Sequence, residues 1–146
     1  TVQRLYEQQI YFAEQPVAPD DVALMADVCK KIKIPVIADE SCLVASDIPK
    51  LVGKVDGINI KLAKTGSLRE ALRMIAVARA HHMMVMVGCM IESSIGITAA
   101  AQITPLVDIC DLDGAALLAH DPYAGATIDK GQLRIPEAPG LGLSVR

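Results

Sequence analysis

Short apolar segments rich in Ile and Val alternate along this chain with segments of helical periodicity. This alternation restricts the fold more than any other feature of the sequence. We expect a buried strand in each of five segments, residues 10–13, 35–38, 57–60, 83–87 and 107–110. The repeat from one expected strand to the next is about 24 residues, the length of a right-handed crossover unit between parallel strands. The sequence therefore predicts an α/β protein with a parallel sheet.

The segments between the expected strands carry helix signals. Apolar residues recur every three or four positions in segments 20–31 and 68–80, and in the second segment we expect an inward face made of Leu72, Ile75 and Val77. Asp20 and Asp21 open the first segment directly after Pro19, and Ser67 stands three residues before Glu70 as a capping box. These signals predict where the two helices begin.

Five parallel strands fit either an open doubly wound sheet or part of an eight-stranded TIM-type (β/α) barrel. A dinucleotide-binding open sheet would carry Gly-x-Gly-x-x-Gly after a strand, and this sequence has no such motif. We therefore expect a partial barrel in residues 1–125, followed by a tail, residues 126–146, that lies over another part of the protein. Because an arc of five strands exposes two sheet edges, we expect a missing N-terminal half, or self-association, to cover them.

Composition excludes several classes of function. The 146 residues carry a net charge of -3, with 14 basic and 17 acidic residues spread along the chain, so no basic stripe is available for nucleic acid. Aromatic residues are 3% of the chain and Trp is absent, which leaves no surface for base stacking. The apolar runs fall short of the roughly 20 residues that a membrane span needs. The four cysteines are far apart in the sequence, so we expect a reducing cytoplasm.

The sequence opens Thr1-Val2-Gln3-Arg4, with neither an initiating Met nor the pattern of a signal peptide. We therefore expect the chain to start inside a longer protein.

Polar residues follow the expected strands at their C-terminal ends, where barrel enzymes place their chemistry. Glu14 follows the first expected strand, Asp39 the second, and Lys61 the third. The fourth runs into Cys89-Met90-Ile91-Glu92 and the fifth into Asp111-Leu112-Asp113. We expect these side chains to line one mouth.

The residue types at this mouth indicate a specific chemistry. Glu14 and Asp39 on adjacent strand ends are suited to one Mg²⁺ ion, which prefers oxygen ligands. Beside such a metal we expect the pKa of Lys61 to be lowered enough for it to act as a general base near neutral pH. A divalent metal and an amine together predict proton abstraction next to a carboxylate, with the metal stabilising the enediolate.

Three segments resemble the muconate-lactonizing subgroup of the enolase superfamily in their order and spacing. They are Phe12-Ala13-Glu14-Gln15-Pro16, Ile34-Pro35-Val36-Ile37-Ala38-Asp39-Glu40-Ser41 and Asn59-Ile60-Lys61-Leu62-Ala63-Lys64-Thr65-Gly66. The resemblance implies that Glu14 and Asp39 are the second and third metal ligands. It also implies that Lys61 is one of two opposed acid/base lysines. The tail is similar to the family's closing segment, which returns toward an N-terminal capping domain absent from this sequence.

Within the subgroup, Asp111-Leu112-Asp113 resembles the pair with which dipeptide epimerases bind the substrate's free ammonium group. Two carboxylates facing a cation form charge-assisted hydrogen bonds, so the pair favours a cationic ligand. The resemblance implies a dipeptide substrate, and the family's best-known substrates are Ala-Glu dipeptides of cell-wall recycling. Cys89, Met90 and Glu92 are further candidates for substrate contact.

Two parts of the family pattern are missing from the sequence. The first metal carboxylate and a Lys-x-Lys pair belong on strands before Thr1, so we expect the chain to be inactive alone. The alternatives are a muconate cycloisomerase or an o-succinylbenzoate synthase-like enzyme of the same fold, or a non-catalytic half-barrel.

Each candidate residue also has a purely structural interpretation. Glu14 alone would be a solvated loop carboxylate, Asp39 a turn residue and Lys61 a surface lysine. Asp111 and Asp113 could cap the turn at Gly114. Glu92 could stabilise the N-terminus of the next helix. For Glu40 and Lys64 a supporting role is at least as strong a prediction as a catalytic one.

Overall fold

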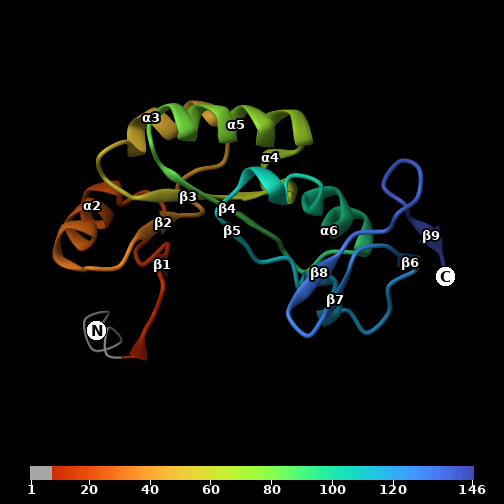
Figure 1. Ribbon diagram of the computed structural model, residues 1–146. Coiled ribbons are helices and arrows are strands. Elements are labelled where there is room, and N and C mark those ends of the chain that lie inside the picture. The colour runs from red at the N-terminus through yellow and green to blue at the C-terminus, as the bar shows by residue number, and fades with distance from the viewer. Residues whose placement is uncertain (1–7) are drawn as a thin grey trace.

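A parallel sheet of five strands forms the centre of the molecule, in a computed structural model that describes residues 8–146 (Figure 1). The strands are β1 (Ala13–Glu14), β2 (Val36–Ala38), β3 (Gly57–Lys61), β4 (Met84–Gly88) and β5 (Ile109–Cys110). They lie side by side in the order of the sequence, and every neighbouring pair is parallel. The predicted parallel sheet is therefore confirmed. The expectation drawn from Thr1 to Arg4 lies outside the described residues.

The outer strands are shorter than the sequence predicts. Strand β1 covers two residues and begins three positions later than expected, and β5 also covers two residues. Within residues 8–146 each of these strands has one neighbour in the sheet, whereas β2, β3 and β4 have two. A segment counts as strand only where a partner supplies ladder hydrogen bonds, so the apolar pattern alone overestimated both lengths.

Helices cover one face of the sheet, and the core lies between the two layers (Figure 1). The helices are α2 (Val22–Lys31), α3 (Ile48–Leu51), α4 (Leu62–Thr65), α5 (Leu68–Ala80) and α6 (Ser94–Ala101), with 3₁₀ turns η2 (Ala45–Asp47), η3 (Thr104–Leu106) and η4 (Gly114–Leu117). Alternate strand residues, including Ile58 and Ile60 of β3, join this core with Met74 of α5. Because side chains alternate across a strand, Asn59 and Lys61 belong to the opposite face.

The two main helices begin where the sequence predicts. The Asp21 side chain accepts a hydrogen bond from the backbone N–H of Leu24, and the Ser67 side chain accepts one from Glu70. The Glu70 carboxylate does not complete the capping box. It accepts the backbone N–H of Ala45 at 2.8 Å instead and so ties α5 to η2.

The inward face of α5 is only partly as expected. Ile75 is buried and Val77 packs against the core, but Leu72 is 46% exposed. Ala71 and Met74 take the buried positions on either side of Leu72. The apolar pattern of a helix is compatible with more than one inward face. Packing against the neighbouring α3 and η2 decides which face is buried.

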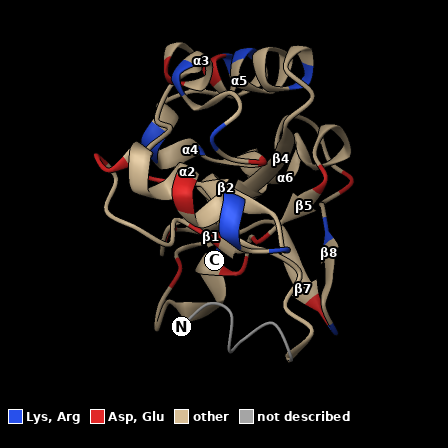
Figure 2. Cartoon of the chain, turned by 90° about the vertical axis from the view of Figure 1, so that its left-hand side faces the viewer, with Lys and Arg blue, Asp and Glu red and all other residues tan. Residues whose placement is uncertain are grey.

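The end of the chain forms two small antiparallel sheets beside α6 and β5 (Figure 1). Strand β6 (Tyr123–Ala124) pairs with β9 (Ser144–Val145), and β7 (Thr127–Asp129) pairs with β8 (Gln132–Arg134). Acidic and basic residues are interspersed along the outer helices (Figure 2). Among residues 8–146, no helix has the length and apolarity to cross a membrane.

Aspartates tie neighbouring strands together at the N-terminal end of the sheet. Asp56 and Asp108 each precede a strand and accept a backbone N–H from the start of the strand before it. Asp56 accepts from Val36, the first residue of β2, and Asp108 accepts from Val85, the second residue of β4, both at 2.8 Å. Arg79 of α5 donates to both oxygens of Asp108, at 2.6 and 3.0 Å. These contacts lie at the opposite end of the sheet from Lys61, so we expect them to serve stability.

Replacing Arg79 by Met should therefore destabilise the protein in a pH-dependent way. The hydrogen bond from Arg79 holds the pKa of Asp108 below its ordinary value of 3.8. A lowered folded-state pKa stabilises the protein above the ordinary pKa, and this contribution is lost as the pH falls through the folded pKa. With side chains 40% and 39% exposed, the pair should contribute about 0.5–1 kcal/mol at neutral pH.

Thermal unfolding at neutral pH, compared with unfolding in acid below the folded pKa of Asp108, measures this difference. Arg69→Met is the matched control, since Arg69 is exposed on the same helix and forms no ion pair within residues 8–146. An Arg79→Met deficit of equal size in acid would contradict the assignment to Asp108.

Candidate functional site

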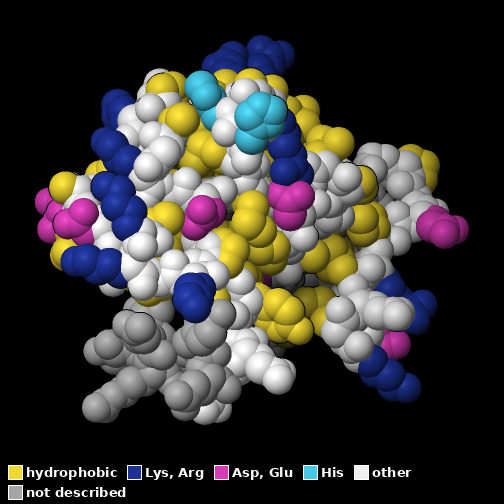
Figure 3. All heavy atoms as spheres, turned by 60° about the vertical axis from the view of Figure 1, so that its left-hand side comes forward, with side chains coloured by type: hydrophobic (Ala, Val, Ile, Leu, Met, Phe, Trp, Pro, Cys, Tyr) yellow, Lys and Arg dark blue, Asp and Glu magenta, His cyan; other side chains and the backbone are white. Residues whose placement is uncertain are grey.

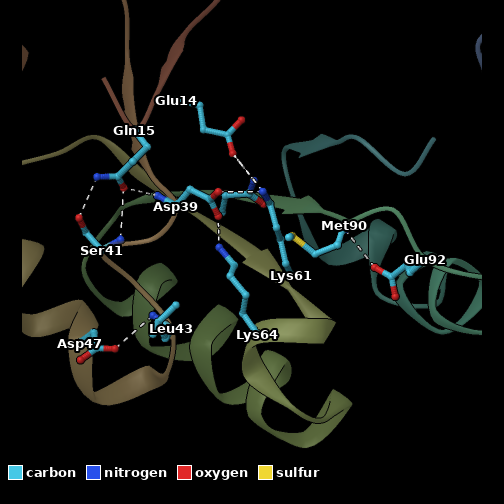
Figure 4. Close-up of polar contacts among 11 residues, drawn as sticks. Glu14, Gln15, Asp39, Ser41, Leu43, Asp47, Lys61, Lys64, Met90 and Glu92 are labelled. Atoms are coloured by element: carbon cyan, nitrogen blue, oxygen red, sulfur yellow. Dashed lines mark hydrogen bonds and ion pairs between the residues drawn. The ribbon is translucent and has the colours of Figure 1, made fainter. Parts of the chain in front are cut away.

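Three predicted residues meet at the C-terminal ends of neighbouring strands (Figure 4). Glu14 is the last residue of β1, Asp39 follows β2 directly, and Lys61 is the last residue of β3. The Lys61 Nζ lies 2.7 Å from Asp39 Oδ2 and 3.8 Å from Glu14 Oε1. The structure therefore brings together side chains that are 22 or more positions apart in sequence.

The parallel register explains why these side chains converge. Glu14 pairs with Ile37 across β1 and β2, and Asp39 lies two residues beyond Ile37, so both carboxylates leave the same face of the sheet. Lys61 lies opposite Gly88 on β4, where no side chain competes for space. The C-terminal ends of parallel strands share one edge, so the three groups must be neighbours.

Lys64 joins the group from helix α4. Its Nζ forms an ion pair with Asp39 Oδ1, while Lys61 takes Oδ2. The Asp39 side chain is 4% exposed and each lysine side chain is 15% exposed. Asp39 is therefore a buried carboxylate between two ammonium groups, and Lys64 directly supports a predicted metal ligand.

Burial and ion pairing act in opposite directions on these groups. Burial disfavours the Asp39 anion, but hydrogen bonds from Lys61 and Lys64 outweigh it and hold the pKa of Asp39 below its ordinary value. Burial likewise disfavours the Lys61 cation, but the bond to Asp39 and the charges of Asp39 and Glu14 raise the pKa of Lys61. Two carboxylates within 4 Å of the amine thus raise the pKa of Lys61 in this arrangement, and the lowered pKa expected for Lys61 beside a bound metal stays a prediction.

The Gln15 side chain connects the loops that follow β1 and β2, which carry the two carboxylates. No role was predicted for Gln15 from the sequence. Its Oε1 accepts the backbone N–H groups of Asp39 and Ser41, at 2.9 and 3.2 Å. Its Nε2 donates to Ser41 Oγ at 2.9 Å and to the Val17 carbonyl at 3.1 Å. All four hydrogen-bonding positions of the amide are used, which joins the β1 loop to the β2 loop. The only sequence signal was its place between Glu14 and Pro16.

Asn59 is a second residue that the sequence analysis passed over except as part of a motif. It lies on β3 two residues before Lys61, and its Nδ2 donates to Glu14 Oε1 at 2.6 Å. Asn59 is 1% exposed. A buried amide on the face that carries Lys61 was a usable signal, but its partner is 45 residues away in sequence.

Glu14 and Asp39 together offer oxygen ligands for a hard cation. Their oxygens approach one point closely enough that a single ammonium, Lys61 Nζ, lies within 4 Å of both. Among residues 8–146 no group of three or more His, Cys, Asp or Glu side chains is gathered to hold a metal. The two carboxylates thus fit part of an Mg²⁺ coordination shell, which takes one or two carboxylates and several waters.

The candidates at the end of β4 do not join this group. The Glu92 carboxylate turns back to accept the backbone N–H of Met90 at 3.2 Å, and it lies against Gly96 in the first turn of α6. Met90 is half-exposed. Burial raises the pKa of the Cys89 thiol. Their part in substrate contact stays a prediction.

Asp111 and Asp113 leave β5 on the side that carries the site. The backbone N–H of Asp111 continues the ladder to Val87, at 2.9 Å. Asp113 occupies the N-cap position of η4, yet its side chain makes no capping hydrogen bond. Both aspartates line a recess of about 200 Å³, together with Leu133 of β8. For Asp113 this geometry does not support the capping interpretation.

Known proteins resemble this chain along its whole length. A sequence profile of the family described as enolase C-terminal domain-like matches residues 1–146. The L-Ala-D/L-amino acid epimerase of Maribacter sp. is 47% identical over 143 residues, which are 97% of this chain and 42% of that protein. This chain therefore spans about two fifths of the length of the curated relatives it matches.

Two solved structures show the same arrangement. The L-Ala-D/L-Glu epimerase from Bacillus subtilis, in a substrate-liganded complex, is 33% identical with a TM-score of 0.90, over 97% of this chain and 42% of that one. The dipeptide epimerase from Enterococcus faecalis, complexed with Mg and the dipeptide L-Leu-L-Tyr, is 38% identical with a TM-score of 0.90, over 98% of this chain and 43% of that one. The expected partial barrel, rather than an open sheet, is thereby confirmed.

Proposed function

Since the chain belongs to the enolase C-terminal domain-like family, we propose that it is the C-terminal part of the barrel of a magnesium-dependent dipeptide epimerase. Several curated relatives and structural neighbours are dipeptide epimerases, and two of those neighbours were solved with Mg and a dipeptide. The observation that carries the proposal is the convergence of Glu14, Asp39 and Lys61 on one point at the strand ends.

Each residue has a distinct role in the proposed reaction. Glu14 and Asp39 hold the divalent cation, which when bound neutralises the negative charge that builds up on the substrate carboxylate. Lys61 takes the α-proton of the second residue of the dipeptide on one face. A lysine from outside this chain returns a proton on the other face and so inverts the centre. Lys64 and Gln15 hold Asp39 in position.

Binding of the cation to Glu14 and Asp39 would change the surroundings of Lys61. In the structure the two carboxylates stabilise the Lys61 ammonium and raise its pKa. With a divalent cation held by Glu14 and Asp39, their attraction for the Lys61 ammonium would be weaker, and the cost of releasing its proton would be lower. That change would have the direction predicted from the sequence for Lys61 beside a metal.

We propose that the remaining parts of the active site come from outside this chain. The family pattern calls for the first metal carboxylate and an opposed lysine, and an N-terminal half would close the barrel edges at β1 and β5. The tail would then return toward the capping domain. Exposed hydrophobic side chains gather on the face seen in Figure 3, which supports covering by further protein. The chain alone would be inactive, and the full enzyme would act on dipeptides in the cytoplasm, with cell-wall recycling as one setting.

The direct test is proton exchange by the full-length protein in deuterated water with Mg²⁺. We expect deuterium at the α-carbon of the second residue of an Ala-Glu or hydrophobic dipeptide, from either stereoisomer. Muconate and succinylbenzoate precursors lack an ammonium group for Asp111 and Asp113, so we expect no turnover of them. Turnover of such a precursor without dipeptide exchange would favour the alternative enzymes instead.

Replacing both Asp111 and Asp113 by Asn should weaken dipeptides far more than N-acylated dipeptides. Loss of charge-assisted hydrogen bonds to the ammonium should cost about 2–3 kcal/mol, or roughly 30- to 150-fold in kcat/KM. The measurement is kcat/KM for the free and the N-acetylated substrate. Asp129→Asn is the control, because Asp129 is exposed on β7 and, among residues 8–146, pairs only with Arg134. Equal losses for both substrates would contradict the assignment.

A further inference from the structure

Asn59 is a buried polar residue on the face of β3 that carries Lys61. It is 1% exposed and lies between Gly57 and Lys61 on the same side of the strand. Its partner in the β4 register is Met86, which is also buried. An amide in such a position must gain something from its hydrogen bonds, because a buried polar group without partners destabilises the fold.

Within residues 8–146 the amide makes one hydrogen bond, and that bond is to a proposed metal ligand. Asn59 Nδ2 donates to Glu14 Oε1 at 2.6 Å. The same oxygen is the one that Lys61 Nζ approaches at 3.8 Å. Donation from Asn59 thus fixes the rotation of the Glu14 carboxylate and leaves Oε2 for another partner.

The end of β4 is shaped to accommodate this amide. A Cβ added at Gly88 would lie 2.7 Å from Asn59 Nδ2 and 2.8 Å from Oδ1, closer than atoms pack. Gly88 is opposite Lys61 in the register, so the missing side chain creates room directly beside the site. Asn59 therefore depends on glycine at position 88.

The second atom of the amide has no partner within the described chain. Asn59 Oδ1 is buried and accepts no hydrogen bond from residues 8–146. If the residue served packing alone, an apolar side chain would fill the space without burying an unpaired oxygen. Its donor group is therefore the property that position 59 requires.

We propose that Asn59 is a positioning residue of the metal site, which orients the Glu14 carboxylate toward the divalent cation. This inference rests on the proposed function, since it assumes that Glu14 is a ligand. The expected effect is on cation affinity, because residues that hydrogen-bond to a ligand typically change metal affinity about 10- to 100-fold when replaced.

The test is Mn²⁺ binding to the full-length protein, with free Mn²⁺ counted by electron paramagnetic resonance. Asn59→Leu should raise the Kd for Mn²⁺ about 10- to 100-fold. The thermal midpoint of the metal-free variant should stay equal to that of the wild type or rise. Ile58→Val is the matched control on the same strand, because Ile58 faces the helices, and its Kd should not change.

A second variant displaces the Asn59 amide without replacing Asn59. Gly88→Ala should displace Asn59 and raise the Kd about tenfold, at the lower end of the same range. It replaces Asn59→Leu as the deciding variant if that protein does not fold. A wild-type protein that binds Mn²⁺ and an Asn59→Leu variant with the same Kd would overturn this inference alone. A wild-type protein that binds no Mn²⁺ would overturn the proposed metal site as well.

Discussion

Replacing Lys61 by Ala in the full-length protein is expected to reduce α-proton exchange in deuterated water by about 100- to 10,000-fold for the dipeptide stereoisomer whose α-proton faces Lys61. A positioned general base contributes about 10²- to 10⁴-fold to a rate, and the proposed mechanism assigns no second base to that face. Nuclear magnetic resonance of the substrate α-proton measures the exchange for each stereoisomer separately. Exchange from both isomers at the wild-type rate would rule out Lys61 as the base.

A second substitution at position 61 separates the base from its charge. Lys61→Arg keeps a cation beside Asp39 and Glu14, but a guanidinium is not deprotonated near neutral pH. We expect this variant to fold and to lose exchange as completely as Lys61→Ala. Lys50→Ala is the control, because Lys50 lies on α3 with a side chain 72% exposed and pairs only with Asp47 in the part of the chain that the structure describes.

Replacing Asp39 by Asn should abolish useful Mg²⁺ binding and also weaken the fold. Replacing a residue that only hydrogen-bonds to a metal ligand lowers metal affinity by up to about 100-fold. Loss of the charge of a ligand itself should therefore raise the Kd for Mg²⁺ by at least that factor. The ammonium groups of Lys61 and Lys64 lose their buried counter-charge, which should cost up to about 3 kcal/mol.

Isothermal titration with Mg²⁺ and denaturant unfolding measure the two effects of Asp39→Asn separately. Asp27→Asn serves as the control, since Asp27 is an exposed carboxylate on α2. We expect its Kd and unfolding midpoint to match the wild type. An Asp39→Asn protein whose Mg²⁺ affinity stays within about twofold of the wild type would remove Asp39 from the proposed ligand set. Replacing a ligand should lower the affinity more than replacing a residue that only supports a ligand.

Local pattern predicted most of the scaffold. The apolar segments predicted all five strands, and Asp21 and Ser67 predicted the starts of two helices, because alternation and capping depend only on residues a few positions apart. The same local signals failed where a distant segment competes. Ala71 and Met74 are buried in place of the expected Leu72, and the Glu70 carboxylate accepts the N–H of Ala45 instead of capping its own helix.

The site was predicted in part for the same reason. Glu14, Asp39 and Lys61 could be named because each closes an apolar segment, and parallel strands bring such ends to one edge. Gln15 and Asn59 could not be given roles, because their partners lie 24 to 45 residues away. The upward shift of the Lys61 pKa also needed the distances to both carboxylates.

The sequence by itself determined the parallel order of the strands and the residues at their C-terminal ends. The period of the apolar residues and the spacing between strand segments depend only on residue order. Only the tertiary structure decided which atoms touch: that Lys61 and Lys64 share Asp39, that Asn59 holds Glu14, and that Gly88 makes room for it. The physical reason is that hydrogen bonds and ion pairs depend on separations of about 3 Å. Such separations exist only after register and packing have placed distant strands side by side.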